Sequence, residues 1–335
     1  MNVVSKIKEC ALKKEEKFLS KYATFSSKTL GRDFVEEECP MRTEFQRDRD
    51  RIIYSKAFIR LKNKTQVFFS PEGDHYMTRL THTLDVSQIA RSIARALNLN
   101  EDLAEAISLG HDLGHTPFGH SGERVLNKLS PNGFRHNEQS LRVVEVIEKD
   151  GKGLNLTKEV RDGILNHKTS TTPLTLEGKV VRLSDKIAYL NHDVEDALRA
   201  GAIQKSDLPK SVTEVLGEDT RVRINTMITS VYLNSLNKND VMLSCEVEKA
   251  MQELRAFMFE RVYNTDLARG EEERAGNMLS AMYDTFKKYP EKMPKPYVKL
   301  LDRFSLDTVI CDYISGMTDR YAISTFTKLF IPQNF

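Results

Sequence analysis

The segment GHDLGHTPFGHSGE, from Gly110 to Glu123, holds three of the chain's eight histidines together with two acidic residues. Its His111-Asp112 pair places a nitrogen ligand beside an oxygen ligand, a composition typical of a metal site. Apolar residues recur at a helical spacing just before the pair, so we expect it to end a mostly apolar helix over 103–113. Polar groups in such a place need partners. We therefore expect the fold to be organised around this segment.

A single histidine at the end of an apolar helix is usually a core residue bonded to a carbonyl, and His111 alone would be explained in that way. His115, however, follows one turn later on the same helix face. A proline and a glycine then interrupt the helix, and His120 and Glu123 follow as a pair three residues apart. The segment thus indicates a metal site, whose missing ligands must come from elsewhere in the chain.

The composition excludes several classes of protein. With 335 residues and 40% hydrophobic content, the chain can bury a substantial core in one large or two smaller domains. The net charge of +2 creates no global field that demands a nucleic acid or a membrane. The four cysteines lack the paired spacing of a zinc site, the first twenty residues contain no signal peptide, and no apolar run has the length of a membrane span. We expect a cytoplasmic protein with free thiols.

The apolar pattern is helical almost throughout. Residues 41–66 carry an apolar stripe beside many arginines and acids, and residues 67–77 have the pattern of a small β-hairpin. A stretch near 206–219 resembles a linker. Further helices are predicted over 79–97, 138–148, 157–165, 176–200, 246–262, 271–289 and 306–329.

Two polar residues on these predicted helices could supply the missing ligands. His82 is near the start of one helix, ahead of its apolar stripe. Asp185 is set into the apolar pattern of 176–200, where an acid is either paired or bound to a metal.

In that order, His82, His111-Asp112 and Asp185 resemble the H…HD…D signature of HD-domain metal-dependent phosphohydrolases. Longer segments resemble one group of that family, the bacterial dGTPase-like deoxynucleoside triphosphate triphosphohydrolases. The resemblance covers the chain from about Met41 onward, whereas residues 1–40 match nothing. The matching segments are RLTH at 79–82, HDLGHTPFGHSGE at 111–123, RHNEQS at 135–140, DKIAYLNHDVEDAL at 185–198 and CDYISGMTDRYA at 311–322.

The resemblance implies an all-α fold with a small β-hairpin. Its catalytic HD-domain core would span 41–205, and a C-terminal helical region over 206–335 would pack on that core. Residues 1–40 would form a separate helical or extended segment.

The resemblance also implies roles for individual residues. One divalent metal ion, for which Mn²⁺, Mg²⁺, Fe²⁺ and Zn²⁺ all suit the mixed ligands, would be held by His82, His111, Asp112 and Asp185. The catalytic positions match His120, Glu123 and His136, where Glu123 would keep His120 protonated so that it can donate a proton to the leaving 5′-oxygen. The substrate-binding positions match Gln66, Arg79, His115, Lys186, Tyr189 and Asp193.

The implied reaction is the hydrolysis of a deoxynucleoside triphosphate at its α-phosphorus, giving a deoxynucleoside and inorganic triphosphate. Tyr189, packed under the sugar, would disfavour a 2′-hydroxyl. The family also implies a homo-oligomer and a nucleotide effector. Two alternatives stay open: another HD phosphohydrolase activity, on nucleoside monophosphates or signalling nucleotides, and a nucleotide sensor or single-stranded nucleic-acid binder. The arginines near Arg49 fit nucleic acid, but without interleaved aromatic residues they favour a structural role.

Overall fold

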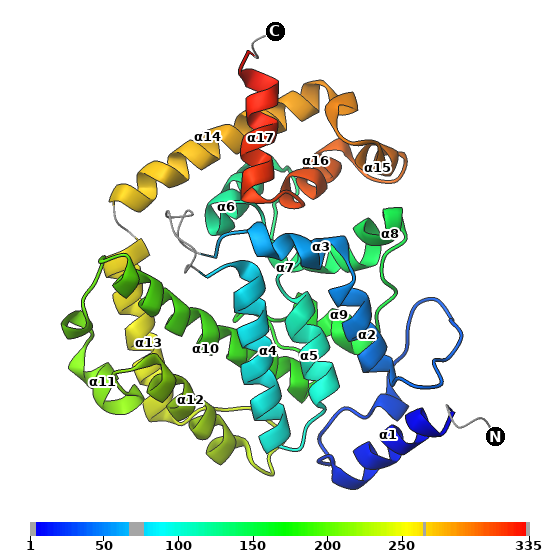
Figure 1. Cartoon of the computed structure of the whole chain (residues 1–335), viewed down its shortest axis with the longest axis vertical. Coiled ribbons are helices and arrows are strands. Elements are labelled where there is room, and N and C mark those ends of the chain that lie inside the picture. The colour runs from blue at the N-terminus through cyan, green and yellow to red at the C-terminus, as the bar shows by residue number, and fades with distance from the viewer. Residues whose placement is uncertain (1–4, 67–76, 264–265, 333–335) are drawn as a thin grey trace. The chain divides into compact units, whose positions relative to one another are not determined.

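The computed structural model describes residues 5–66, 77–263 and 266–332, and these form an all-α protein in which no described residues build a sheet (Figure 1). The predicted fold class is therefore confirmed. The predicted β-hairpin falls almost entirely on residues 67–76, which lie outside the described residues. Beside them, Thr65 and Thr78 form a single antiparallel bridge.

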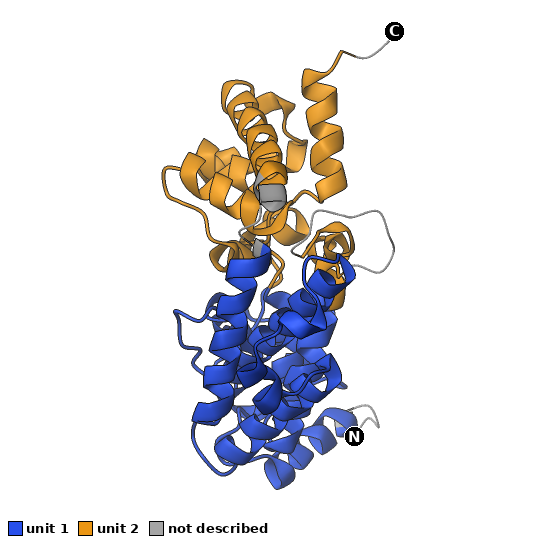
Figure 2. Ribbon diagram, turned by 90° about the vertical axis from the view of Figure 1, so that its left-hand side faces the viewer, with its two compact units in different colours: residues 1–53, 82–111, 155–265 blue, residues 54–81, 112–154, 266–335 orange. Residues whose placement is uncertain are grey.

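The chain divides into two compact units, each built from three separate stretches (Figure 2). Unit 1 contains residues 1–53, 82–111 and 155–265, and unit 2 contains residues 54–81, 112–154 and 266–335. His111 is thus the last residue of its stretch in unit 1, and Asp112 is the first of its stretch in unit 2. The division predicted from the sequence, at residues 40 and 205, stays a prediction.

Unit 1 contains the helices that carry the first part of the candidate site. Its α5 packs against α2, α9 and α10, and α10 also packs against α12 and α13. The helix α4 begins with its first turn in unit 2 and continues in unit 1. The bounds are α1 (Ser5–Phe18), α2 (Glu44–Ile53), α4 (Arg79–Ala96), α5 (Glu101–Gly110), α9 (Lys158–Leu165), α10 (Leu176–Arg199), α11 (Lys210–Leu216), α12 (Thr220–Ser235) and α13 (Cys245–Met258).

Two glycines let α5 and α9 approach each other closely. A Cβ atom on Gly110 would lie 2.5 Å from Cδ1 of Ile164, and one on Gly163 would lie 2.5 Å from Cδ1 of Ile107. Both isoleucines are fully buried. The absence of a side chain at each glycine therefore lets the apolar residue of the other helix pack against the backbone. This packing fixes the end of α5, where His111 follows.

The described part of the N-terminal segment is held by buried carboxylates of unit 1. Glu177, which is fully buried, accepts hydrogen bonds from the backbone N–H and the hydroxyl of Thr24, at 2.9 and 2.8 Å. Glu159 does the same for the hydroxyl of Thr29 and the backbone N–H of Leu30. Because buried carboxylates need such donors, this segment is part of the unit's structure and not a loose extension.

Unit 2 is built around an apolar cluster between α6 and the C-terminal helices α14 and α16, which includes Leu126, Leu279 and Ile310. Its helices are α3 (Lys56–Arg60), α6 (Gly119–Leu129), α7 (His136–Arg142), α8 (Glu148–Gly151), α14 (Asp266–Lys288), α15 (Lys295–Val298), α16 (Leu306–Ser315) and α17 (Asp319–Phe330). A π-helical turn, Val143–Ile147, continues α7.

Three predicted elements differ from the observed ones. The helix predicted over 103–113 ends at Gly110, so His115 does not continue its face but lies in the turn that follows. The linker predicted near 206–219 contains α11, which packs on α12 and α13. The closing helix predicted over 306–329 is two helices, because the chain leaves α16 at Gly316 and Thr318 caps the start of α17.

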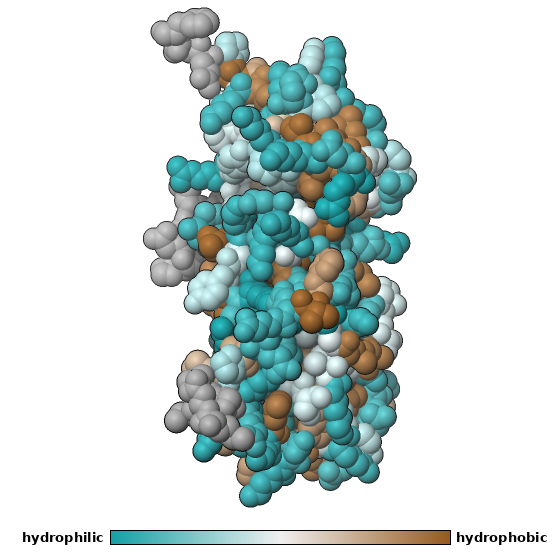
Figure 3. Space-filling view, turned by 90° about the vertical axis from the view of Figure 1, so that its right-hand side faces the viewer, coloured by the Kyte–Doolittle hydropathy of each residue, from teal (hydrophilic) through white to brown (hydrophobic). Residues whose placement is uncertain are grey.

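Apolar residues form separate groups on the one face of the protein that Figure 3 shows. On the face shown in Figure 3 these groups, coloured brown, are set among predominantly hydrophilic side chains. Exposed apolar residues such as Phe34, Tyr54 and Leu233 are spread along the sequence. Among the described helices, none combines the length and the apolar character that crossing a membrane requires.

Candidate active site

In unit 1, two histidines converge on one carboxylate oxygen. The Nε2 atom of His82, on α4, lies 3.1 Å from Oδ1 of Asp185, on α10. The Nε2 atom of His111, which directly follows α5, lies 3.8 Å from the same oxygen. Both imidazole rings are buried. Three helices thus bring together three of the four predicted metal ligands.

In each of these two histidines, the hydrogen bond made by Nδ1 determines whether Nε2, which faces Asp185, carries a proton or a lone pair. The Nδ1 atom of His111 lies 2.6 Å from the carbonyl oxygen of Ser108, which can only accept, so Nδ1 carries the proton. His192 donates from Nε2 to the Asp85 carboxylate at 2.6 Å. Its Nδ1 atom faces Nδ1 of His82 at the long distance of 3.5 Å. In this series of hydrogen bonds His82 donates from Nδ1 to His192, so the lone pair of His82 is on Nε2. Metal sites whose ligating histidines are oriented by a carboxylate have the same arrangement.

The donor set fits a divalent cation. Two imidazole lone pairs aimed at a carboxylate oxygen repel one another and the oxygen unless a proton or a cation lies between them. Nitrogen and oxygen donors in this mixture suit borderline divalent metals. The structure therefore supports a metal site at His82, His111 and Asp185 in unit 1.

In unit 2, the carboxylate of Asp112 is shared by two neighbours. Arg79 donates to its Oδ2 at 2.8 Å, and His115 places Nε2 3.1 Å from its Oδ1. Burial, with the positive charge of Arg79 next in importance, holds the pKa of His115 well below its ordinary value. His115 is therefore neutral at physiological pH and can donate or accept a hydrogen bond.

A second cluster in unit 2 is built around Glu123 on α6. Glu123 accepts hydrogen bonds from the backbone N–H of His136 at 3.0 Å and from its Nδ1 at 2.8 Å. Nδ1 of His120 lies 3.6 Å from the same carboxylate. Burial alone would raise the pKa of Glu123, but the contacts with His120 and His136 hold it well below its usual range. Glu123 is thus an ionised acceptor that orients two histidines.

The two clusters of unit 2 are joined by a ring contact. The rings of His115 and His136 stack with their centroids 3.9 Å apart and an angle of 18° between their planes. His120 is 65% exposed, whereas His115 and His136 are buried. His120 is therefore the histidine of this group that a substrate can reach without displacing another side chain.

Gln66 and Arg79 lie beside this group in unit 2. The guanidinium of Arg79 is buried, and besides Asp112 it donates to the backbone oxygen of Gln66 at 3.4 Å. The side-chain oxygen of Gln66 is buried and has no hydrogen-bond partner among the described residues. Such an acceptor is suited to binding a polar group of a ligand.

In unit 1, α10 carries the three remaining predicted residues. Tyr189 and Asp193 follow Asp185 by one and two turns on the same helix face, as the helical spacing predicted. Burial raises the pKa of Tyr189 to about 12, so its hydroxyl stays protonated. Burial, and then the nearby charge of Arg182, lower the pKa of Lys186 from its ordinary value. Together they line one face of the helix with a cation, an aromatic ring and a carboxylate.

All thirteen predicted site residues lie within the described part of the chain. The structure places six in unit 1 (His82, His111, Asp185, Lys186, Tyr189, Asp193) and seven in unit 2 (Gln66, Arg79, Asp112, His115, His120, Glu123, His136). The sequence reasoning missed His192 and Asp85, which orient His82, and His167, whose ring meets that of His111 edge-on at 5.1 Å. The segment DKIAYLNHDVEDAL already contained His192, at helical spacing from Asp185.

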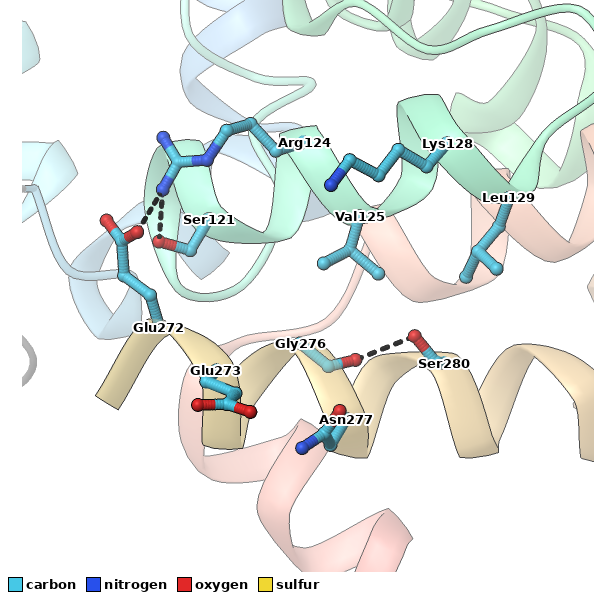
Figure 4. A pocket seen from close by; sticks show the side chains of 10 residues that line it. All are labelled: Ser121, Arg124, Val125, Lys128, Leu129, Glu272, Glu273, Gly276, Asn277 and Ser280. Atoms are coloured by element: carbon cyan, nitrogen blue, oxygen red, sulfur yellow. Dashed lines mark hydrogen bonds and ion pairs between the residues drawn. The ribbon is translucent and has the colours of Figure 1, made fainter. Parts of the chain in front are cut away.

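A cavity of about 430 Å³ between α6 and α14 contains none of these residues (Figure 4). Its wall on α6 includes Arg124, which forms an ion pair with Glu272 of α14 at 2.5 Å, and Lys128. The α6 residues drawn in Figure 4 lie on a face of that helix that Glu123 does not share, and the other residues drawn belong to α14.

Two family models match parts of the chain. Residues 79–190 match the HD domain, and residues 241–328 match the phosphohydrolase-associated domain. A phosphohydrolase from Bacteroides thetaiotaomicron has a similar fold, with a TM-score of 0.54 and 18% identity over 84% of this chain and 68% of that one. The chain thus contains an HD domain and a phosphohydrolase-associated domain, the composition of an HD-domain phosphohydrolase.

Similarity to curated proteins extends over nearly the whole chain. A deoxyguanosinetriphosphate triphosphohydrolase-like protein of Caldanaerobacter subterraneus is 57% identical, covering 98% of this chain and 96% of its own. One of Clostridium tetani is 48% identical over 92% of both chains. The chain belongs to the family of deoxyguanosinetriphosphate triphosphohydrolase-like proteins.

Proposed function

We propose that the protein hydrolyses deoxynucleoside triphosphates to a deoxynucleoside and inorganic triphosphate, through attack of water at the α-phosphorus. The observation that carries the proposal is the group formed by His120, Glu123 and His136 in unit 2. A metal site alone serves many phosphohydrolases, but an ionised carboxylate that orients two histidines adds a proton donor for a leaving oxygen. The names of the full-length relatives support the same substrate class.

One divalent cation, Mn²⁺, Mg²⁺, Fe²⁺ or Zn²⁺, would be held by His82, His111, Asp112 and Asp185. Asp112 joins the set because it directly follows His111 in the chain. When bound, such an ion offsets phosphate charge and polarises oxygen ligands as a Lewis acid. The hydrogen bonds from Asp85 through His192 to His82 keep the lone pair on Nε2 of His82 available for the metal ion.

His120 is the proton donor of the proposed reaction. Its Nδ1 faces the ionised Glu123 at 3.6 Å. A protonated imidazole in this position can give a proton to the leaving 5′-oxygen. Glu123 also fixes His136 through two hydrogen bonds, so it is the residue on which the orientation of both rings depends.

The remaining residues bind the substrate. A nucleoside triphosphate carries about four negative charges at neutral pH, which Lys186 and Arg79 offset together with the metal. His115, whose Nε2 faces the Asp112 carboxylate, contributes its uncharged ring to the surroundings of the phosphates. Tyr189 packs under the sugar, while Asp193 and Gln66 accept hydrogen bonds from the nucleoside. A homo-oligomer, a nucleotide effector and a cytoplasmic location remain predictions from the family resemblance.

The alternative is a different HD activity, on nucleoside monophosphates or signalling nucleotides. It would use the same metal ligands but leave Glu123, His120 and His136 without a task in proton transfer. The second alternative, a nucleotide sensor or single-stranded nucleic-acid binder, requires none of the metal-ligating side chains. The intact donor set and the Glu123 cluster therefore favour the triphosphohydrolase.

The test is to incubate the metal-loaded protein with each of the four dNTPs and with GTP, and to separate the products. The proposal predicts deoxynucleoside and triphosphate from at least one dNTP, and much slower hydrolysis of GTP than of dGTP. Nucleoside monophosphate or diphosphate as the main product would refute it.

A further inference from the structure

The segment from Asp312 to Asp319, which leaves α16 and enters α17, contacts every stretch of unit 2 that carries a candidate catalytic or substrate-binding residue. We call residues 312–319 the C-terminal tether. It lies within the phosphohydrolase-associated domain, far in sequence from the HD domain. Its contacts are polar and buried or partly buried, and three of its residues make them: Asp312, Ser315 and Asp319.

Asp319 joins two of these stretches. Its Oδ1 accepts the backbone N–H of Phe118 at 3.0 Å, and its Oδ2 accepts the backbone N–H and the hydroxyl of Thr65 at 2.9 and 2.7 Å. Phe118 precedes α6 and has a left-handed backbone, with φ of +61°. A bulky residue is unfavourable in that conformation unless its surroundings hold it. The first turn of α6 carries His120, so the bond from Asp319 holds the backbone that directs this side chain.

Lys64 provides a second connection. Its side chain is fully buried, and its Nζ donates to the backbone oxygen of His115 and to that of Ser315, the latter at 2.7 Å. Burial, and then the charge of Arg60, hold the pKa of Lys64 well below its ordinary value. A buried amine that bridges two carbonyls fixes the distance between the turn after α5 and the tether.

Asp312 provides the third connection, to α7. This carboxylate, 1% exposed, accepts hydrogen bonds from Gln139 Nε2 at 2.9 Å and from Arg142 Nε and Nη2, both at 2.7 Å. The first residue of α7 is His136. The bidentate contact with Arg142 therefore fixes the helix that presents His136 to Glu123.

These contacts together exceed what packing of α16 and α17 requires. Apolar residues such as Ile310, Ile314 and Ala322 already bury these helices in the core of unit 2. The tether adds charged hydrogen bonds to backbone atoms next to catalytic side chains, where an error of about 1 Å costs up to about 100-fold in rate. The polar contacts thus serve the position of the histidines more than the stability of the helices.

We propose that Asp319 is a positioning residue for catalysis, which acts through Phe118 on His120 and through Thr65 on the neighbouring Gln66. Lys64 and Asp312 support it by fixing His115 and α7. The inference rests on the proposed function, since it assigns His120 a role in the reaction. It gives the phosphohydrolase-associated domain a task in the chemistry of the HD domain.

The test compares Asp319→Asn and Thr65→Val with Glu272→Gln as a control. The asparagine has the shape of the aspartate, but it has only one side-chain oxygen and cannot accept hydrogen bonds from both Phe118 and Thr65. Thr65→Val removes the hydroxyl that donates to Asp319. Glu272→Gln breaks the exposed ion pair with Arg124, which also joins the C-terminal region to α6. All three variants keep the predicted metal ligands.

We expect kcat for the best dNTP to fall by about 10- to 100-fold in Asp319→Asn and by a smaller factor in Thr65→Val, with KM raised through Gln66 in both variants and bound metal unchanged. Glu272→Gln should retain wild-type kcat, since exposed ion pairs contribute little. An unchanged kcat in folded Asp319→Asn would overturn the proposal, as would a lower melting temperature with unchanged kcat. If Asp319→Asn does not fold, an unchanged kcat in Thr65→Val overturns it equally.

Hydrogen–deuterium exchange separates this proposal from the proposed function. If the wild-type protein releases no triphosphate from any dNTP, the proposed function fails, but the tether is still tested. At least one of the peptides that contain Phe118 and Thr65 should exchange faster in Asp319→Asn than in Glu272→Gln, because the single side-chain oxygen of asparagine cannot accept from both amides. Equal exchange in the two variants would show that Asp319 does not hold the turn.

Discussion

His192 orients a predicted metal ligand without being one itself. It lies between His82 and Asp85, and its two ring nitrogens have opposite roles, one donating to the carboxylate and one facing His82. Removing a group that orients a ligating histidine typically weakens metal binding by 10- to 100-fold. We expect that loss in His192→Ala, measured by metal titration. Wild-type affinity would contradict the tautomers assigned to His82 and His192.

The metal ligands themselves should show a larger effect. His111→Ala removes a nitrogen that faces Asp185, so the purified variant should contain less than stoichiometric metal and have no activity, with its fold intact. Metal analysis and circular dichroism measure the two properties separately. A variant that keeps stoichiometric metal would show that His111 is not a ligand.

Glu123 should affect turnover and not binding. We expect Glu123→Gln to bind metal and nucleotide as the wild type does, because Glu123 touches His120 and His136 rather than a predicted ligand. Its kcat should fall at least about 100-fold, in the range typical of general acid–base groups. Equilibrium binding and single-turnover rates decide this. If Glu123→Gln bound nucleotide more weakly but kept its turnover, Glu123 would be a substrate-positioning residue and not part of proton transfer.

The same residue gives a pH prediction for stability. In the folded state the pKa of Glu123 is far below its unfolded value, so its contribution to stability is present above that unfolded value of about 4.3 and is lost as the pH falls toward the folded pKa. The difference in melting temperature between the wild type and Glu123→Gln should therefore be full at pH 5 and shrink below about pH 4.3. A constant difference from pH 5 to pH 3 would contradict this.

At the scale of single elements, close helix packing through Gly163 can be tested directly. An alanine there would place its Cβ within 2.7 Å of three side-chain atoms of Ile107, so Gly163→Ala should lower the free energy of unfolding by about 1–3 kcal/mol. Gly270 in α14 has no atom within 4 Å of such a Cβ, and Gly270→Ala should stabilise by up to about 1 kcal/mol. Denaturant unfolding measures both. Equal changes in the free energy of unfolding would show that helix propensity, and not packing, determines the effect of both substitutions.

The elements differ in how far the sequence could predict them. The apolar stripe of residues 176–200 is long and uninterrupted, and α10 (Leu176–Arg199) agrees with it to one residue. The end of α5 at Gly110 was missed because the following residues continue the apolar spacing. The break at Gly316 was missed because the apolar pattern resumes after it in nearly the same phase. Such ends depend on tertiary contacts, which a local pattern does not contain.

At the scale of the molecule, the sequence predicted the residue types of the site but not the bonds that hold them. The quoted motifs contain twelve of the thirteen candidate residues, and the family resemblance added Gln66. No sequence pattern predicts the hydrogen bond between Lys64 and Ser315 or that between Thr65 and Asp319, because each pair is separated by more than 250 residues. Contacts at that separation depend on the fold as a whole and leave no periodic signal.

The central claim is that water attacks the α-phosphorus and that the deoxynucleoside leaves, and hydrolysis in ¹⁸O-labelled water tests it most directly. The protein is loaded with metal and given its preferred dNTP, and the products are analysed by mass spectrometry. Attack at the α-phosphorus puts one ¹⁸O atom in inorganic triphosphate and none in the deoxynucleoside, which is the result we predict. Labelled orthophosphate together with a deoxynucleoside diphosphate would mean attack at the γ-phosphorus and would contradict the account.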